Sequence, residues 1–229
     1  MSMINIPTFK QGDPRWGNLK LVDGKHWTLA SDGCFITSLS AALNPFFGFT
    51  PDTFYAKLRE TDGINTEGMV NWYGVERATE KKAVFIERQY TDLDPRQNGM
   101  EMEVRVAINR VRRYMDLGSP VVLTVDLLKN DGIADHAVLA YDYILDGDEV
   151  VDFWIMDPAF GEKCLMTKRY GKPDDKLYGY VGLSLPPITF PDSSKLQKFG
   201  GAFWKAGMVS IGKDVETYSG EIVQNFLSV

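Results

Sequence analysis

The sequence predicts an α+β fold in which N-terminal helices pack on one side of a mostly antiparallel β-sheet. Helical patterns dominate the first part of the chain, and a run of strand patterns follows them. Two of those strands, at residues 136–145 and 148–157, are joined by Asp-Gly-Asp. Because Asp-Gly is a strong two-residue hairpin sequence, these strands are expected to be antiparallel neighbours.

The first predicted helix begins at Cys34. Ser31 and Asp32 before it are helix-capping residue types, and apolar residues then recur three or four positions apart. Asn44-Pro45 predicts its end, because a residue before proline is disfavoured in the helical region. Further helices are predicted at 49–63, where Thr50 is a cap and Pro51 suits the first position, around 67–73, and at 100–117, where apolar residues form one face.

Strands are predicted at 83–90 and 119–128 in addition to the hairpin. The segment 119–128 is apolar on both faces and is therefore expected to be a central strand. We expect residues 1–185 to form one domain, since no repeat or linker appears there. Residues 186–229 are predicted to be a C-terminal extension of unknown role, unless they belong to the same domain.

The composition excludes several classes of protein. The chain has 25 Lys and Arg against 31 Asp and Glu, a net charge of −6, which argues against a nucleic-acid partner. No apolar run approaches the roughly 20 residues that span a bilayer, so no membrane insertion is expected. The N-terminus lacks the pattern of a signal peptide, which predicts a cytoplasmic protein or one released without such a signal. Two cysteines and two histidines fit no metal-ligand spacing.

Cys34 is a candidate nucleophile. At a helix N-terminus a cysteine meets the positive end of the helix dipole, which favours the thiolate. The alternative is a small buried hydrophobic residue at the start of a core helix. A thiol nucleophile also needs a base, and the base needs an orienting group.

His136 and Asp157 are the candidates for these two roles. If Asp146-Gly147 is the turn, the hairpin register places His136 directly opposite Asp157 on one face, with Cβ atoms about 4.5–5.5 Å apart. A three-residue loop would instead send the two side chains to opposite faces. The alternatives are an ordinary strand histidine and an Asp-Pro turn opener. His26 has no comparable partner and is expected in a loop.

Attack on a carbonyl further requires an oxyanion hole. The backbone N–H of Cys34 is one candidate donor, and the side-chain amide of Gln11, in "FKQGDPRW", is the second. The alternative for Gln11 is an ordinary loop glutamine.

Five segments, in this order, resemble one family: "FKQGDPRWGNLKL", "SDGCFITSLSAALN", "TPDTFYAKL", "DHAVLAYDY" and "IMDPAFG". They resemble papain-like cysteine peptidases of the bacteriocin-leader-processing type, especially the stand-alone peptidase C39-like members of bacteria and phages. The resemblance implies a papain-like fold with Cys34 as nucleophile, His136 as general base and acid, Asp157 as orienting carboxylate and Gln11 in the oxyanion hole. It implies no metal or organic cofactor, and it covers residues 7–162.

The implied activity is hydrolysis of an amide bond in a peptide or a peptidoglycan stem peptide through a thioester. Two alternatives remain: transfer of the acyl group to an amine by the same triad, and an inactive papain-like binding module. Phe35 favours the second, because the family usually has a small residue after the cysteine. The missing signal peptide is compatible with a phage-encoded enzyme.

Overall fold

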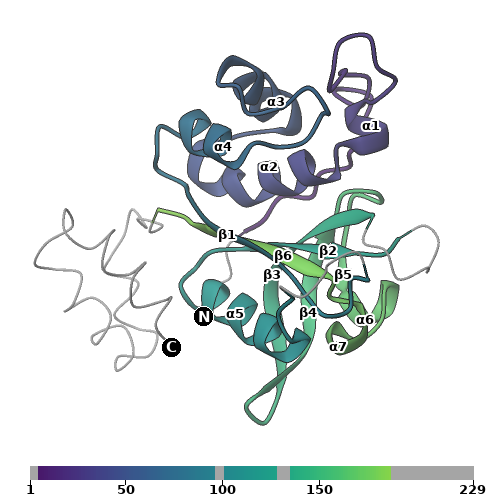
Figure 1. Cartoon of the computed structure of the whole chain (residues 1–229), viewed down its shortest axis with the longest axis vertical. Coiled ribbons are helices and arrows are strands. Elements are labelled where there is room, and N and C mark those ends of the chain that lie inside the picture. Colours follow the sequence, from purple (N-terminus) through teal and green to yellow (C-terminus); the bar gives the residue numbers. More distant parts are fainter. Residues whose placement is uncertain (1–4, 96–100, 128–134, 187–229) are drawn as a thin grey trace, which may run out of the picture. The chain divides into compact units, whose positions relative to one another are not determined.

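A six-stranded antiparallel sheet forms the centre of the fold, with the strand order β1-β6-β2-β3-β4-β5 (Figure 1). The computed structural model describes residues 5–95, 101–127 and 135–186. The strands are β1 (Val84–Tyr90), β2 (Val121–Val125), β3 (His136–Asp146), β4 (Glu149–Asp157), β5 (Glu162–Leu165) and β6 (Gly179–Ser184). Every pairing between them is antiparallel, which confirms the predicted α+β class.

Helices cover both faces of this sheet (Figure 1). The N-terminal helices lie on one face, as predicted: α1 (Leu29–Asp32), α2 (Cys34–Phe47), α3 (Pro51–Glu60) and α4 (Trp72–Ala78). The other face carries α5 (Val104–Asp116), α6 (Met166–Arg169) and α7 (Pro173–Lys176). The sheet therefore separates two hydrophobic clusters.

The central strand β2 shows how the two clusters are built. All five of its residues are buried, as the apolar pattern predicts. Val122 belongs to the cluster under α2, whereas Leu123 belongs to the cluster under α5. Successive side chains of a strand point to opposite faces, so one short apolar strand contributes to both cores.

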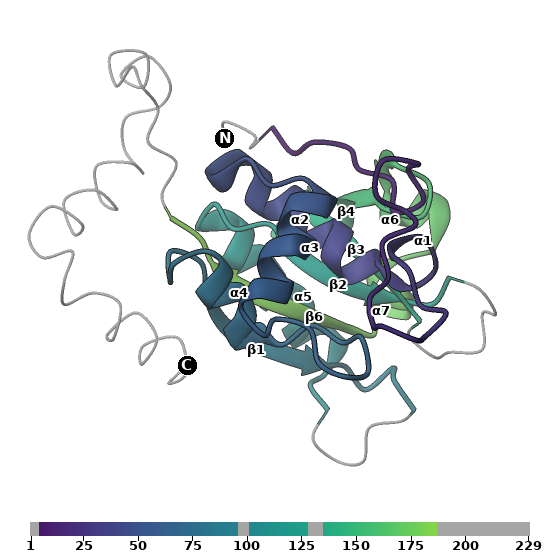
Figure 2. The same ribbon diagram turned by 90° about the horizontal axis from the view of Figure 1, so that it is seen from above.

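Helix α2 lies across β2 and β3 (Figure 2) and is longer than predicted. It continues through Pro45 to Phe47, so the predicted end at Asn44 is wrong. The ring of Phe47 packs against the core and stacks on Phe49 with 5.7 Å between centroids, which stabilises the extra turn. Gly48 ends the helix with a φ of 70°, a conformation that glycine adopts without strain.

The remaining helix predictions differ in accuracy. Helix α3 begins at Pro51 with Thr50 as its cap, and α5 lies within the predicted segment, whose residue 100 is outside the described residues. The helix predicted around 67–73 is wrong: α4 begins at Trp72, because Gly68 has a φ of 77° in a turn and the side chain of Asn71 caps the helix.

Residues 5–186 belong to one compact unit, and residues 187–229 lie outside the described residues, so the predicted extension is not tested. Within the described ranges, no helix has the length and apolar character needed to cross a membrane.

Candidate active site

Cys34 is the first residue of α2, and Gly33 links it directly to α1. A Cβ built at Gly33 would lie 2.4 Å from the carbonyl oxygen of Leu29, so no larger residue fits without moving the backbone. The prediction that Ser31 and Asp32 cap the cysteine helix is wrong, because both lie in α1 and Gly33 is the N-cap of α2. Because α1 and α2 meet at Gly33, the packing of these two helices fixes the position of Cys34.

The hairpin of β3 and β4 has a register two residues away from the predicted one. Asp146 pairs with Glu149, so the turn is Gly147-Asp148 rather than Asp146-Gly147. Gly147 has a φ of 61°, and glycine at the first central position is typical of a type II′ turn. Farther along, Leu139 pairs with Met156, because two bulges in the ladder offset each other.

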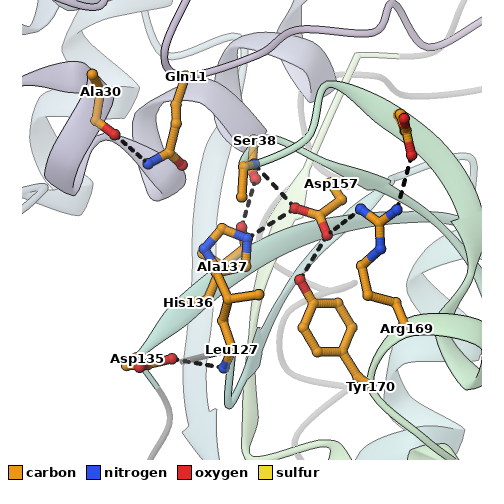
Figure 3. A network of polar contacts seen from close by, with 12 residues as sticks. Gln11, Ala30, Ser38, Leu127, Asp135, His136, Ala137, Asp157, Arg169 and Tyr170 are labelled. Carbon is orange, nitrogen blue, oxygen red and sulfur yellow. Dashed lines mark hydrogen bonds and ion pairs between the residues drawn. The ribbon is translucent and has the colours of Figure 1, made fainter. Parts of the chain in front are cut away.

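His136 is therefore diagonal to Asp157 rather than directly opposite it. A displacement by two residues keeps both side chains on the same face of the sheet, because the side-chain period of a strand is two. The Nε2 atom of His136 lies 3.0 Å from Oδ1 of Asp157, and the side chains are buried, with 4% and 0% exposed (Figure 3). The predicted contact exists, although the predicted direct opposition is wrong.

The carboxylate of Asp157 accepts three further hydrogen bonds. Its Oδ1 also accepts from the backbone N–H of Ala159 at 3.0 Å. Its Oδ2 accepts from Nη1 of Arg169 at 3.0 Å and from the hydroxyl of Tyr170 at 2.6 Å (Figure 3). Burial alone would raise the pKa of Asp157, but the hydrogen bonds from His136, Tyr170 and Arg169, together with the charge of His136, lower it. The carboxylate is thus held ionised beside the imidazole.

His136 interacts with Cys34 as well as with Asp157. Burial would lower the pKa of His136, but the hydrogen bond to Asp157 and the nearby Cys34 outweigh it and raise this pKa to about 9. Because Nε2 is bonded to Asp157, Nδ1 is the ring atom that remains for the thiol. In addition, Ser38 of α2 donates to the carbonyl of Ala137 at 3.2 Å and so ties the cysteine helix to β3 beside His136 (Figure 3).

Gln11 connects the segments that carry the other site residues. Its side-chain Nε2 donates to the carbonyl of Ala30 in α1 at 2.8 Å (Figure 3), and its backbone N–H donates to the carbonyl of Pro158 at 2.8 Å. The loop is therefore fixed between the helix that precedes Cys34 and the residue that follows Asp157. An amide nitrogen carries two hydrogens, so one N–H of Gln11 remains after the bond to Ala30.

The structure adds two residues to the site that sequence reasoning missed, Arg169 and Tyr170. Both lie at the end of α6, beyond the segments that carry the resemblance. Their only sequence feature is an arginine next to a tyrosine, which does not indicate an acidic partner. Within the described part of the chain, no group of three or more His, Cys, Asp or Glu is placed to hold a metal ion.

The family model of the Peptidase_C39 like family matches residues 3–174. The chain belongs to this family. The match spans all four candidate site residues and extends past Arg169 and Tyr170. A search of curated proteins finds no match. Membership in the Peptidase_C39 like family agrees with the helices and antiparallel sheet described above and supports a peptidase activity.

Phe35 departs from the small residue that the resemblance leads us to expect after the cysteine. Its ring packs edge-on against Trp72, with 6.0 Å between centroids. The hydrogen bond between His136 and Asp157 and the interaction of His136 with Cys34 are present in a chain that carries this bulky residue. A large side chain at this position of a C39-like chain is therefore compatible with the assembled site.

Proposed function

We propose that this C39-like chain is a cysteine peptidase that hydrolyses an amide bond in a peptide or in a peptidoglycan stem peptide. One observation carries the proposal: the imidazole of His136 is hydrogen-bonded to the carboxylate of Asp157, and its interaction with Cys34 helps to raise its pKa. This is the relationship of nucleophile, base and orienting group that covalent acyl transfer requires.

The first half of the reaction forms a tetrahedral intermediate. In the reactive state the proton of Cys34 resides on Nδ1 of His136, and this imidazolium is stabilised by Asp157. The thiolate attacks the substrate carbonyl, and the negative charge that develops on its oxygen needs donors. The backbone N–H of Cys34, which has no acceptor in the preceding turn of its own helix, and the remaining N–H of Gln11 supply them.

The second half releases both products. His136 gives its proton to the leaving amine, the carbon–nitrogen bond breaks, and the acyl group stays on the sulfur. A water molecule then loses a proton to His136 and attacks the thioester carbonyl. The carbon–sulfur bond breaks, the acid leaves, and the proton returns to the thiol.

Asp157 keeps the imidazole in the state that these steps need. With Nε2–H donating to the carboxylate, a neutral His136 has its lone pair on Nδ1, facing the thiol. The bonds from Arg169 and Tyr170 hold the carboxylate in place and lower its pKa, so it does not take the proton itself.

Peptide cleavage by three forms of the chain tests the proposal: the unmodified chain, Cys34→Ala, and Cys164→Ala as the matched thiol control. Each is incubated with a mixture of synthetic peptides and with purified peptidoglycan, and new termini are identified by mass spectrometry. We expect new termini from the unmodified chain and from Cys164→Ala and none from Cys34→Ala. Equal cleavage by Cys34→Ala would refute the proposal.

A further inference from the structure

A second group of side chains lies beside the cysteine and is not used by the proposed mechanism. The guanidinium of Arg88, on β1, is 4.9 Å from the ring centroid of Tyr90, 5.6 Å from that of Phe35 and 6.0 Å from that of Trp72. We call these four residues the Arg88 cluster. All four are partly exposed rather than sealed in the core. Distances of up to about 6 Å are those of cation–π contacts.

Arg88 has no anionic partner among the described residues. Its Nε is buried without a hydrogen-bond acceptor, and no carboxylate in those ranges forms an ion pair with it. Two other partly buried arginines do form ion pairs: Arg110 with Glu87 at 2.9 Å and Arg169 with Asp157 at 3.0 Å. A guanidinium that stacks on rings keeps its N–H groups free for a planar anion.

The covalent chain gives one measure of the distance from the Arg88 cluster to Cys34. Phe35 follows Cys34 directly, and consecutive Cα atoms are about 3.8 Å apart. When the length of the phenylalanine side chain and the 5.6 Å between its ring and the Arg88 guanidinium are added, the guanidinium lies within roughly 15 Å of the Cα atom of Cys34.

The sheet register gives a second measure, taken from His136. Thr124 pairs with Ala137 on one side and with Gly179 on the other, and Gly179 pairs with Tyr90. Tyr90 thus lies at the same end of the sheet as His136, three strands away, or about 14 Å. Arg88 pairs with Val181, which belongs to the hydrophobic cluster on the α2 face, so it shares that face with the cysteine helix.

We propose that the Arg88 cluster binds a carboxylate of the peptide substrate, within about four residues of the bond that Cys34 attacks. A distance of 14–15 Å is that of roughly four residues of an extended peptide. The carboxylate belongs to an acidic side chain or to a free C-terminus, and the three rings pack against the apolar part of the same residue. This inference rests on the proposed peptidase function and adds a substrate preference to it.

Binding to the full-length Cys34→Ala variant, measured by calorimetry, tests the inference without depending on cleavage. The probes are acetylated pentapeptides of Ala and Leu with one Glu or one Gln, each with a free or an amidated C-terminus. We expect a Glu peptide or a free-acid peptide to bind roughly 10- to 100-fold more tightly than its Gln or amide counterpart. Whether Glu or the free terminus confers the gain identifies the source of the carboxylate.

Substitutions of Arg88 in the Cys34→Ala background assign the preference. Arg88→Met keeps the apolar stem among the rings and is expected to abolish the difference between acidic and neutral peptides. Arg88→Lys keeps the positive charge but loses the planar set of N–H donors. This variant is expected to retain part of the difference in affinity between acidic and neutral peptides. Arg113→Met, on the exposed side of α5, is the matched control and is expected to retain all of it.

Two results would overturn the inference: equal or no binding of acidic and neutral peptides, or an acid preference that persists in Arg88→Met. Failure of the proposed function is a separate result, seen as cleavage that survives Cys34→Ala or as no cleavage by the unmodified chain. In either case, an acid preference that depends on Arg88 would identify a carboxylate-binding site but not a site for a substrate of Cys34.

Discussion

The Nε2 atom of His136 lies 3.0 Å from Oδ1 of Asp157 although the two residues are two positions away from direct opposition in the hairpin of β3 and β4. The contact depends on the shared face of the sheet and on the length of the imidazole side chain, not on a single register. A shift by one residue would have separated the two side chains completely.

Replacing Asp157 with Asn tests the charge of this contact. Without the carboxylate charge, burial of His136 is expected to prevail, and the pKa of His136 falls below its value of about 9. Because the base is then poorly oriented and less basic, kcat/KM is expected to fall by about 10²–10⁴-fold. The pKa is measured by NMR titration of the imidazole, and Asp146→Asn, at the exposed turn, is the control. An unchanged pKa would show that Asp157 does not set the state of the ring.

The raised pKa of His136 predicts a pH-dependent stability. The folded pKa of about 9 exceeds the ordinary value of 6.5, so the stabilisation is fully present below pH 6.5 and is lost as the pH rises through 9. The shift corresponds to roughly 3 kcal/mol. Urea unfolding of the unmodified chain and of His136→Gln between pH 6 and 10 measures it. The difference between their free energies of unfolding should shrink with rising pH, and a constant difference would disagree with this account.

Tyr170→Phe removes one of the two hydrogen bonds to Oδ2 of Asp157. The pKa of Asp157 is lowered in the fold, so its stabilisation is present above its ordinary value of 3.8 and is lost as the pH falls. Without the tyrosine hydroxyl this pKa rises, and acid unfolding is expected at a higher pH, with a loss of about 1.5–3 kcal/mol near neutrality. Tyr73→Phe, with an exposed side chain, is the control. Identical acid transitions for the two variants would argue against a role for Tyr170.

Gly33→Ala tests the junction of α1 and α2. The added Cβ would lie 2.4 Å from the backbone oxygen of Leu29, which cannot rotate away. We expect a loss of about 1–3 kcal/mol and slower alkylation of Cys34, because the helix start must move. Gly12→Ala, where no atom lies within 4 Å of the new Cβ, is expected to change stability by less than about 0.5 kcal/mol. Equal stability of the two variants would mean that the junction is more adaptable than the close contact indicates.

Gln11→Ala separates binding of the oxyanion from activation of the thiol. Loss of one oxyanion donor is expected to reduce kcat by about 10²–10³-fold. Alkylation of Cys34 by iodoacetamide forms no oxyanion, so its rate is expected to stay unchanged. If both rates fell together, Gln11 would act by supporting the local structure through Ala30 and Pro158 rather than in catalysis.

Much of the fold could be predicted from local patterns, and the errors have identifiable causes. Helix α3, which has a capping box, and helix α5, which has a strong apolar face, were predictable because these determinants lie within or next to each segment. The four-residue elements α1, α6, α7 and β5 were not, since tertiary contacts rather than local propensity hold them. The amphipathic pattern of α5 shows that one face is buried but not which side of the sheet buries it.

The candidate catalytic residues could be predicted from the sequence, whereas the residues that contact them could not. His136 and Asp157 were accessible because hairpin pairing is local. Strand β6, which pairs with Tyr90 through Gly179, could not be predicted because it inserts between strands that come earlier in the chain. The partners Arg169 and Tyr170 reach Asp157 only through tertiary packing of α6, which no pattern within that segment encodes.

The most direct test of the central claim is the rate at which iodoacetamide alkylates each cysteine at neutral pH, followed by peptide mass spectrometry. Cys164 serves as the internal control, because burial raises the pKa of its thiol. The account predicts that Cys34 reacts far faster than Cys164 and that His136→Gln removes most of this difference. Equal, slow labelling of both cysteines in the unmodified chain would contradict the claim that the imidazole of His136 activates Cys34.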